Sequence, residues 1–251
     1  RLTAKPAYAR TALVEFASLP DACNTVNAIL SAGILPATLE LMDQRASTCI
    51  EEAMHLGLPL DVEAILLIEA DGSNLQAVTY EIETAAEICR NSGARKVTVA
   101  KDEAERAKLW KARRSVSPAL ARKAPNKLGE DITVPRSAIP EAVKRLKEVS
   151  AKYGLPIVIF GHAGDGNLHP NILFDKRNAD EWHRVEQVSA EIFGMSVELG
   201  GTLTGEHGVG VLKQPYLELA LGKTVIELQR NIKKVFDPKG LLNPGKKFQA
   251  N

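Results

Sequence analysis

The sequence has 251 residues, of which 32 are Lys or Arg and 31 are Asp or Glu, so its formal net charge is +1. Forty-five per cent of the residues are apolar, which is enough for one large domain or two small ones. The longest apolar stretches cover residues 64–68 and 156–160 and are far shorter than the ~20 residues of a spanning helix. The composition therefore argues against a membrane span and, being nearly neutral, against a general nucleic-acid binder.

The cysteine pattern bears on the compartment. Cys23, Cys49 and Cys89 are an odd number and include no Cys-x-x-Cys pair. We therefore expect no disulfide framework and a reducing compartment. No signal peptide is visible either, so we expect a cytoplasmic location, with peripheral attachment to a membrane left open. Because the sequence starts with Arg rather than Met, we expect it to be cut from a longer protein.

Apolar periodicity and turn residues predict alternating strands and helices. The first part contains predicted strands over 11–17, 38–42, 62–69 and 96–100, with predicted helices over 21–32, 44–55 and, capped by Ser73, up to residue 91. Without the helix over 44–55, this order is β-α-β-β-α-β, which is typical of the ferredoxin-like fold.

A second, similar set of elements follows. Strands are predicted over 131–135, 157–162 and 168–174, and helices from 102 into a basic segment and over 141–153, 179–199 and 223–235. The sequence thus predicts an α+β fold: an antiparallel ferredoxin-like sheet, duplicated and covered by helices, with a C-terminal helical extension.

The basic segment is a first candidate for ligand binding. Residues 111–127 contain six cations and no acid. This run is either a solvated face or an anion receptor. Trp110 lies beside this run, and we expect Pro118 to break the helix. Both features favour a shaped anion receptor over a smooth helical surface.

Two glycine-rich segments hold most of the candidate chemistry. In residues 160–169, a glycine-rich turn between two strands brings His162 and His169 towards one point, which suits a divalent metal such as zinc or, alternatively, two ordinary hydrogen-bonded histidines. In residues 200–210, five glycines surround Glu206 and His207. Glu206 completes a set of two histidines and one carboxylate with an open position, typical of catalytic metal sites, and His207 is then free to act as a general base.

These segments also carry a family resemblance. Gly161-His-Ala-Gly-Asp-Gly-Asn-Leu-His169, Gly201-Thr-Leu-Thr-Gly-Glu-His-Gly-Val-Gly210 and Phe236-Asp-Pro-Lys-Gly-Leu-Leu-Asn-Pro-Gly-Lys246, together with residues 33–43, resemble the C-terminal half of FAD-linked oxidases. That group includes D-lactate dehydrogenase, D-2-hydroxyglutarate dehydrogenase and one of the polypeptides of glycolate oxidase. The resemblance implies a cap or substrate domain over residues 1–205 and a C-terminal segment over 206–251 that returns to an FAD-binding domain preceding Arg1.

The resemblance also implies residue roles. The implied metal ligands are His162, His169 and Glu206; the implied base is His207; the implied substrate-binding residues are Arg113 of a Trp-x-x-Arg element, Asn167 and Lys127; and the implied cofactor-side residue is Asn243. Arg suits a substrate carboxylate because its planar guanidinium can bind both carboxylate oxygens.

The predicted activity is oxidation of a D-2-hydroxy acid to the 2-oxo acid. FAD, held mostly by the absent domain, and a divalent metal, zinc by preference, are the implied cofactors. The implied partners are the small hydroxy acid, an electron acceptor and a second copy or other subunits, with no nucleic acid, and the fragment alone is expected to be inactive. Two alternatives remain at this point: a zinc-dependent hydrolase and a non-catalytic ferredoxin-like anion-binding module.

Overall fold

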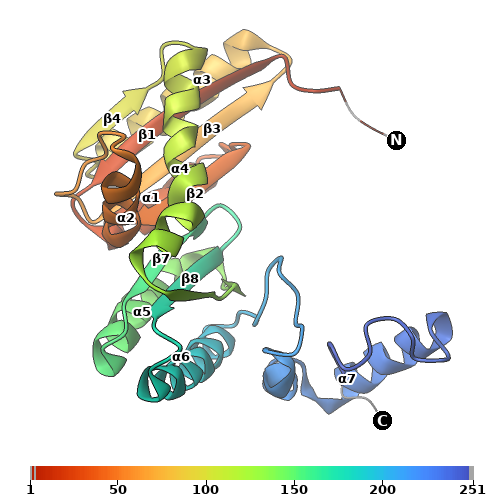
Figure 1. The fold of residues 1–251 in the computed structure, drawn as a ribbon. Helices are drawn as coiled ribbons and strands as arrows, with labels where there is room; N and C mark the ends of the chain where they lie inside the picture. The colour runs from red at the N-terminus through yellow and green to blue at the C-terminus, as the bar shows by residue number, and fades with distance from the viewer. Residues whose placement is uncertain (1, 3, 249–251) are drawn as a thin grey trace.

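A single antiparallel sheet organises the molecule (Figure 1). The computed structural model describes residues 2 and 4–248. Within these residues eight strands are joined in the order β4-β1-β3-β2-β7-β8-β5, with β6 paired to β8, and every pairing is antiparallel. The strands are β1 (Tyr8–Phe16), β2 (Thr38–Asp43), β3 (Ala64–Gly72), β4 (Lys96–Val99), β5 (Asn126–Gly129), β6 (Ile132–Thr133), β7 (Ile157–His162) and β8 (Asn167–Phe174).

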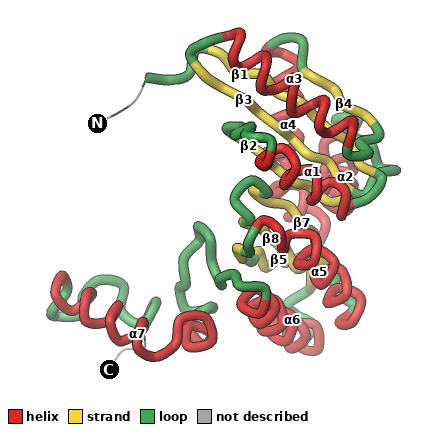
Figure 2. The backbone as a smooth tube through the Cα atoms, turned by 180° about the vertical axis from the view of Figure 1, so that it is seen from behind, coloured by secondary structure: helices red, strands yellow, loops and turns green. Residues whose placement is uncertain are grey.

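Helices cover both faces of this sheet, and Figures 1 and 2 show the two sides. On one face lie α1 (Leu19–Ser31), α3 (Leu75–Asn91), α5 (Ile139–Tyr153) and α6 (Ala179–Glu198); on the other lie α2 (Gln44–Met54) and α4 (Glu103–Lys123). Two 3₁₀ turns, η1 (Arg136–Ala138) and η2 (Gln214–Tyr216), precede α5 and α7 (Leu217–Phe236). No helix in the described part of the chain has the length and apolar character needed to cross a bilayer.

Strand alternation produces two hydrophobic cores. Ala12 and Val14 of β1 face the core under α1 and α3, whereas Leu13, between them, faces the core under α2 and α4. Phe160 of β7 belongs to this second core. Because side chains two residues apart share a face, the second core and the polar side chains beside it lie on the same side of the sheet.

The two halves of the sheet repeat one strand order. The first half reads β4-β1-β3-β2. In the second half an isolated bridge joins Thr202 to Thr133 of β6, so the order there is residue 202, β6, β8, β7. The predicted α+β class and helix-covered antiparallel sheet are confirmed. The finer assignment of a duplicated ferredoxin-like unit stays a prediction, which the repeated order supports.

A short seam joins the halves. It pairs β2 with β7 through Glu40↔His162, Leu41↔Gly161 and Met42↔Phe160. Glu40 lies among apolar neighbours on a buried strand and is itself only 5% exposed. The seam therefore brings a buried carboxylate beside the first histidine of the glycine-rich hairpin.

Two local predictions were wrong. The helix over 75–91 is capped by Asn74 rather than Ser73, because the Asn74 side chain accepts hydrogen bonds from the N–H groups of residues 76 and 77. Pro118 does not break its helix, since α4 continues from Glu103 to Lys123. β5 was not predicted at all, because a four-residue strand with two polar side chains has no clear alternation.

The C-terminal segment differs from the rest of the chain. α7 lies away from the sheet (Figure 1) and changes direction at Gly222, whose φ is 70°. The predicted helix over 223–235 corresponds to the part after this bend. Several large apolar side chains of the segment are exposed, namely Leu219, Leu228, Ile232, Val235, Phe236, Leu241 and Leu242. The domain boundary between residues 205 and 206 stays a prediction.

Candidate metal and substrate site

The β7–β8 hairpin places His162 and His169 next to each other, as the sequence predicts. His169 pairs with Phe160 across the hairpin, and His162 pairs with Asn167. The two imidazole rings are edge to face, with centroids 5.2 Å apart. The turn requires glycine at Gly166, where φ is +76° and a Cβ atom would lie 2.1 Å from the carbonyl oxygen of Val134.

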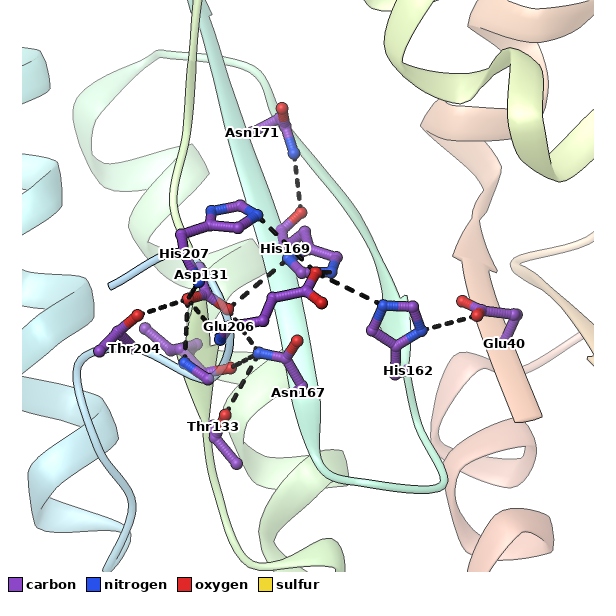
Figure 3. A network of polar contacts seen from close by, with 12 residues as sticks. Glu40, Asp131, Thr133, His162, Asn167, His169, Asn171, Thr204, Glu206 and His207 are labelled. Atoms are coloured by element: carbon purple, nitrogen blue, oxygen red, sulfur yellow. Dashed lines mark hydrogen bonds and ion pairs between the residues drawn. The ribbon is translucent and has the colours of Figure 1, made fainter. Parts of the chain in front are cut away.

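Glu206 reaches the same point from the glycine-rich loop (Figure 3). Its Oε1 atom lies 3.6 Å from Nε2 of His162 and 3.3 Å from Nε2 of His169. Two ligands bound to one tetrahedral zinc ion at ~2.1 Å are about 3.4 Å apart. The three side chains predicted as ligands therefore converge with spacings that suit one divalent ion, and their ligand atoms all lie within 4.8 Å of one another.

Glu40 orients His162, a role that the sequence analysis missed. Its Oε1 atom lies 2.6 Å from Nδ1 of His162. Burial favours a higher pKa for Glu40, but the hydrogen bond from His162 and the charge of Arg113 outweigh it and lower the pKa below its usual value. An ionised carboxylate accepts hydrogen bonds only, so Nδ1 carries a proton and Nε2 is the ring nitrogen that faces Glu206. The signal was available in the sequence: a single carboxylate inside an apolar strand.

Arg113 belongs to α4, which packs on the face of the sheet that carries Glu40 and Phe160. Its Nε atom donates to Oε2 of Glu40 at 2.8 Å, and its guanidinium lies over the ring of Phe160 at 5.0 Å. One turn earlier on the helix, Trp110 donates from Nε1 to Glu69 at 2.6 Å. The Trp-x-x-Arg element thus docks α4 on two strand carboxylates. Arg113 keeps further guanidinium donors for an anion.

His169 and His207 have different surroundings. His169 is 6% exposed, and burial together with the charge of neighbouring His162 lowers its pKa to about 4. It is therefore neutral at pH 7, which is the form that binds metals. His207 stacks on it, with centroids 5.2 Å apart and planes 9° from parallel, while its own side chain is 49% exposed. An accessible imidazole beside the three predicted ligands has the position expected of a base.

The other predicted residues are placed as follows. Nδ2 of Asn167 donates to Oδ1 of Asp131, to the carbonyl of Ile132 and to Oγ1 of Thr133, so this nitrogen is already used within the protein. Lys127 donates to Ser117 and pairs with Leu173, which is four residues from His169 and so on the same face of β8.

Asn243 is not brought to this site. It lies in the tail after α7, has a φ of 48° and accepts a hydrogen bond from the N–H of Lys246. Asp131, by contrast, is a second residue that the sequence analysis missed, since we placed it only at the start of a strand. It is fully buried and accepts hydrogen bonds from the loop that carries Glu206 and His207.

A cavity of about 380 Å³ opens beside His162. Its polar wall includes Glu40, His162, Arg136 and Asp165, and its apolar wall is formed by residues 35–37, Leu30 and Leu39. Space for a small molecule is therefore available next to His162.

The sequence matches one protein family over nearly its whole length. The model of "FAD linked oxidases, C-terminal domain" covers residues 5–247. The chain belongs to this family. As a FAD-linked oxidase C-terminal domain, it is 47% identical over 248 residues to "Glycolate oxidase subunit GlcD" of Bacillus subtilis, a match that covers 99% of this chain and 53% of the relative. It is 33% identical over 235 residues to "D-lactate dehydrogenase" of Archaeoglobus fulgidus, covering 93% and 50%.

Solved structures share the fold. A crystal structure of p-cresol methylhydroxylase with substrate bound superposes with a TM-score of 0.74 at 14% identity, over 97% of this chain and 53% of that one. The 4-ethylphenol oxidase of Gulosibacter chungangensis superposes with a TM-score of 0.68 at 16% identity, over 97% and 54%. The chain spans about half the length of the relatives it matches. Membership in the family leaves the hydrolase and the anion-binding module without support.

Proposed function

We propose that this domain forms the substrate half of an FAD-linked enzyme that oxidises a small 2-hydroxy acid, of D configuration where that carbon is chiral, to the 2-oxo acid. The observation that carries the proposal is the convergence of His162, His169, Glu206 and His207 beside the guanidinium of Arg113. The names of the relatives support it, because glycolate and D-lactate are both 2-hydroxy acids.

We propose that His162, His169 and Glu206 hold a divalent metal, zinc by preference. Support comes from the spacing of their ligand atoms and from the hydrogen bond of His162 to Glu40, a common arrangement around metal-bound histidines. When bound, such an ion lowers the pKa of a hydroxyl group as a Lewis acid.

The remaining steps use side chains of this domain. Arg113 binds the substrate carboxylate with the guanidinium donors that Glu40 leaves free. His207 takes the proton of the substrate hydroxyl onto its imidazole ring. FAD supplies the hydride acceptor when it is bound by the other half of the enzyme. Asn167 and Lys127 are proposed as further substrate contacts.

The C-terminal segment is proposed to dock on the flavin-binding half. Large apolar side chains of α7 and the tail are exposed, and such a surface is normally covered by another domain or chain. Asn243 lies in this tail and is proposed to approach the cofactor from it. Assembly with other subunits, an external electron acceptor, a cytoplasmic location and peripheral membrane attachment stay predictions.

Anaerobic flavin reduction tests the function directly. The full-length flavoprotein is mixed with glycolate, D-lactate, L-lactate or p-cresol, and the visible absorbance of the flavin is followed. Bleaching by glycolate or D-lactate, with L-lactate slower, is the expected result. Bleaching by the phenol but by none of the hydroxy acids would overturn the proposal.

A further inference from the structure

The loop that carries Glu206 and His207 is held by one carboxylate. Oδ2 of Asp131 accepts hydrogen bonds from the backbone N–H groups of Gly205 at 2.9 Å, Glu206 at 3.1 Å and His207 at 2.9 Å. It also accepts one from Oγ1 of Thr204 at 2.6 Å. Figure 3 shows Asp131 beside this turn, with Glu206 extending towards the histidines.

Regular structure does not order this turn. Apart from the bridge at Thr202, residues 200–213 contain no helix or strand. Successive backbone N–H groups that converge on one point form a nest, which binds an anion. Here the anion is a side chain of the protein itself. The direction of the Glu206 and His207 side chains therefore depends on the backbone that Asp131 fixes.

The close approach of the turn also limits its sequence. A Cβ atom on Gly205 would lie 2.3 Å from Nδ2 of Asn167 and 2.5 Å from Oγ1 of Thr133. Asn167 in turn donates to Oδ1 of Asp131 at 2.6 Å. The amide and the turn thus bind the two oxygens of the same carboxylate.

A buried lysine compensates the charge. Nζ of Lys213 donates to the backbone carbonyl of Asp131 at 2.9 Å and lies 3.7 Å from its Oδ2 atom. Both side chains are nearly inaccessible to solvent. With these donors around it, the carboxylate is held in place and ionised.

Asp131 also faces one of the histidines. Nδ1 of His169 has no hydrogen-bond partner within the described residues. It lies 3.9 Å from Oδ1 of Asp131, which is too far for a hydrogen bond. Asp131 therefore adjoins His169 as well as the backbone of Glu206 and His207.

We propose that Asp131 is a positioning residue: it sets the backbone of residues 205–207 so that Glu206 meets the two histidines and His207 stacks on His169. The roles of Glu206 and His207 rest on the proposed function; the hold of Asp131 on the turn does not. Residues that orient metal ligands typically change metal affinity or activity by about 10- to 100-fold when replaced.

The test uses the full-length flavoprotein with Asp131→Asn. Asparagine removes the charge, and its amide oxygen can face the turn only if its NH2 group faces Nδ2 of Asn167, which is also a donor. We expect amide hydrogen exchange of residues 205–207 in the metal-free protein to accelerate at least tenfold. We also expect kcat to fall by about 10- to 100-fold, with KM changed less because Arg113 is unaltered. Asp43→Asn is the matched control, because Asp43 is a buried carboxylate that accepts two backbone N–H groups elsewhere.

A second pair of variants tests the proposal independently, in case Asp131→Asn does not fold. Thr204→Val removes one donor to the carboxylate and the acceptor for the N–H of Gly208, whereas Thr204→Ser keeps the hydroxyl and should recover most of the loss of kcat. Unchanged exchange at residues 205–207 in both Asp131→Asn and Thr204→Val would overturn the proposal, and so would faster exchange with unchanged kcat. If the enzyme instead contains no metal or oxidises no hydroxy acid, the exchange result still stands, and the proposed function is the part that fails.

Discussion

Glu40 on β2 and His162 on β7 are 122 positions apart in the sequence, yet a carboxylate oxygen of one lies 2.6 Å from Nδ1 of the other. The same carboxylate binds Arg113 through its second oxygen. One buried side chain therefore orients both His162, a proposed metal ligand, and Arg113, the proposed anion receptor.

Glu40→Gln tests this arrangement. Glutamine keeps the shape but loses the charge that holds the proton on Nδ1, so we expect metal affinity and kcat/KM each to fall by about 10- to 100-fold. Metal retained after dialysis against a chelator and steady-state kinetics are the measurements. Glu15→Gln is the control, since Glu15 is also a buried strand carboxylate but pairs with Lys96. Equal losses in the two variants would mean that burial alone, and not the contact with His162, is responsible.

Replacing Arg113 tests substrate binding. Arg113→Met removes a charge-assisted interaction worth ~1.5–3 kcal/mol, so kcat/KM should fall at least about tenfold, while Arg113→Lys should lose the paired geometry and recover only part. Arg114→Met is the matched control, because the neighbouring guanidinium lies over Trp110 instead. If kcat/KM falls in Arg114→Met but not in Arg113→Met, then Arg114 and not Arg113 binds the substrate carboxylate.

The metal proposal is tested by composition. Elemental analysis of the full-length enzyme should find about one divalent ion per chain, with strong depletion in His162→Ala and Glu206→Ala, because two remaining ligands hold an ion poorly. His183→Ala, on a side chain that is 71% exposed, should keep the ion. The same metal content in all of these proteins would remove His162 and Glu206 from the ligand set.

Stability should depend on pH through Glu69. Hydrogen bonds from Arg106, Thr11 and Trp110 outweigh burial and hold the pKa of Glu69 below its ordinary value of 4.5. Between these two pKa values the unfolded chain binds more protons than the folded chain, so this contribution is fully present above pH 4.5 and is lost as the pH falls through the folded pKa.

The corresponding variant is Glu69→Gln. It should lower the free energy of unfolding by ~1.5–3 kcal/mol at neutral pH, and the difference from wild type should shrink as the pH falls. Urea unfolding over a pH series measures this. Glu103→Gln removes the other partner of Arg106, a carboxylate with a 77% exposed side chain, and should have a small effect. A difference that grows on acidification would contradict the assignment.

The domain by itself should be folded and catalytically silent. Two buried cores predict cooperative unfolding of the purified chain. Mixed with FAD, a D-2-hydroxy acid and a dye acceptor, it should reduce no more dye than a sample without protein. Tight flavin binding with bleaching of the dye would show that this half carries far more of the cofactor site than we propose.

The sequence predicted most of the strands because their apolar alternation is local. It also predicted that His162, His169 and Glu206 would meet, since glycine-rich turns bring polar residues out of buried strands. It did not show Glu40 or Asp131 as partners, because their contacts depend on the β2–β7 register and on a bond from residue 131 to residues 204–207. A single sequence contains no direct measure of such distant pairing.

The Glu40↔His162 pair is also the last pair of the seam between the two halves of the sheet. The ends of paired strands open more readily than their middles, and a slip of one residue would turn Glu40 to the opposite face. A twist of one half against the other therefore acts on the hydrogen bond that orients His162. An adjoining domain that binds both halves of the sheet would therefore change the orientation of His162 without contacting it.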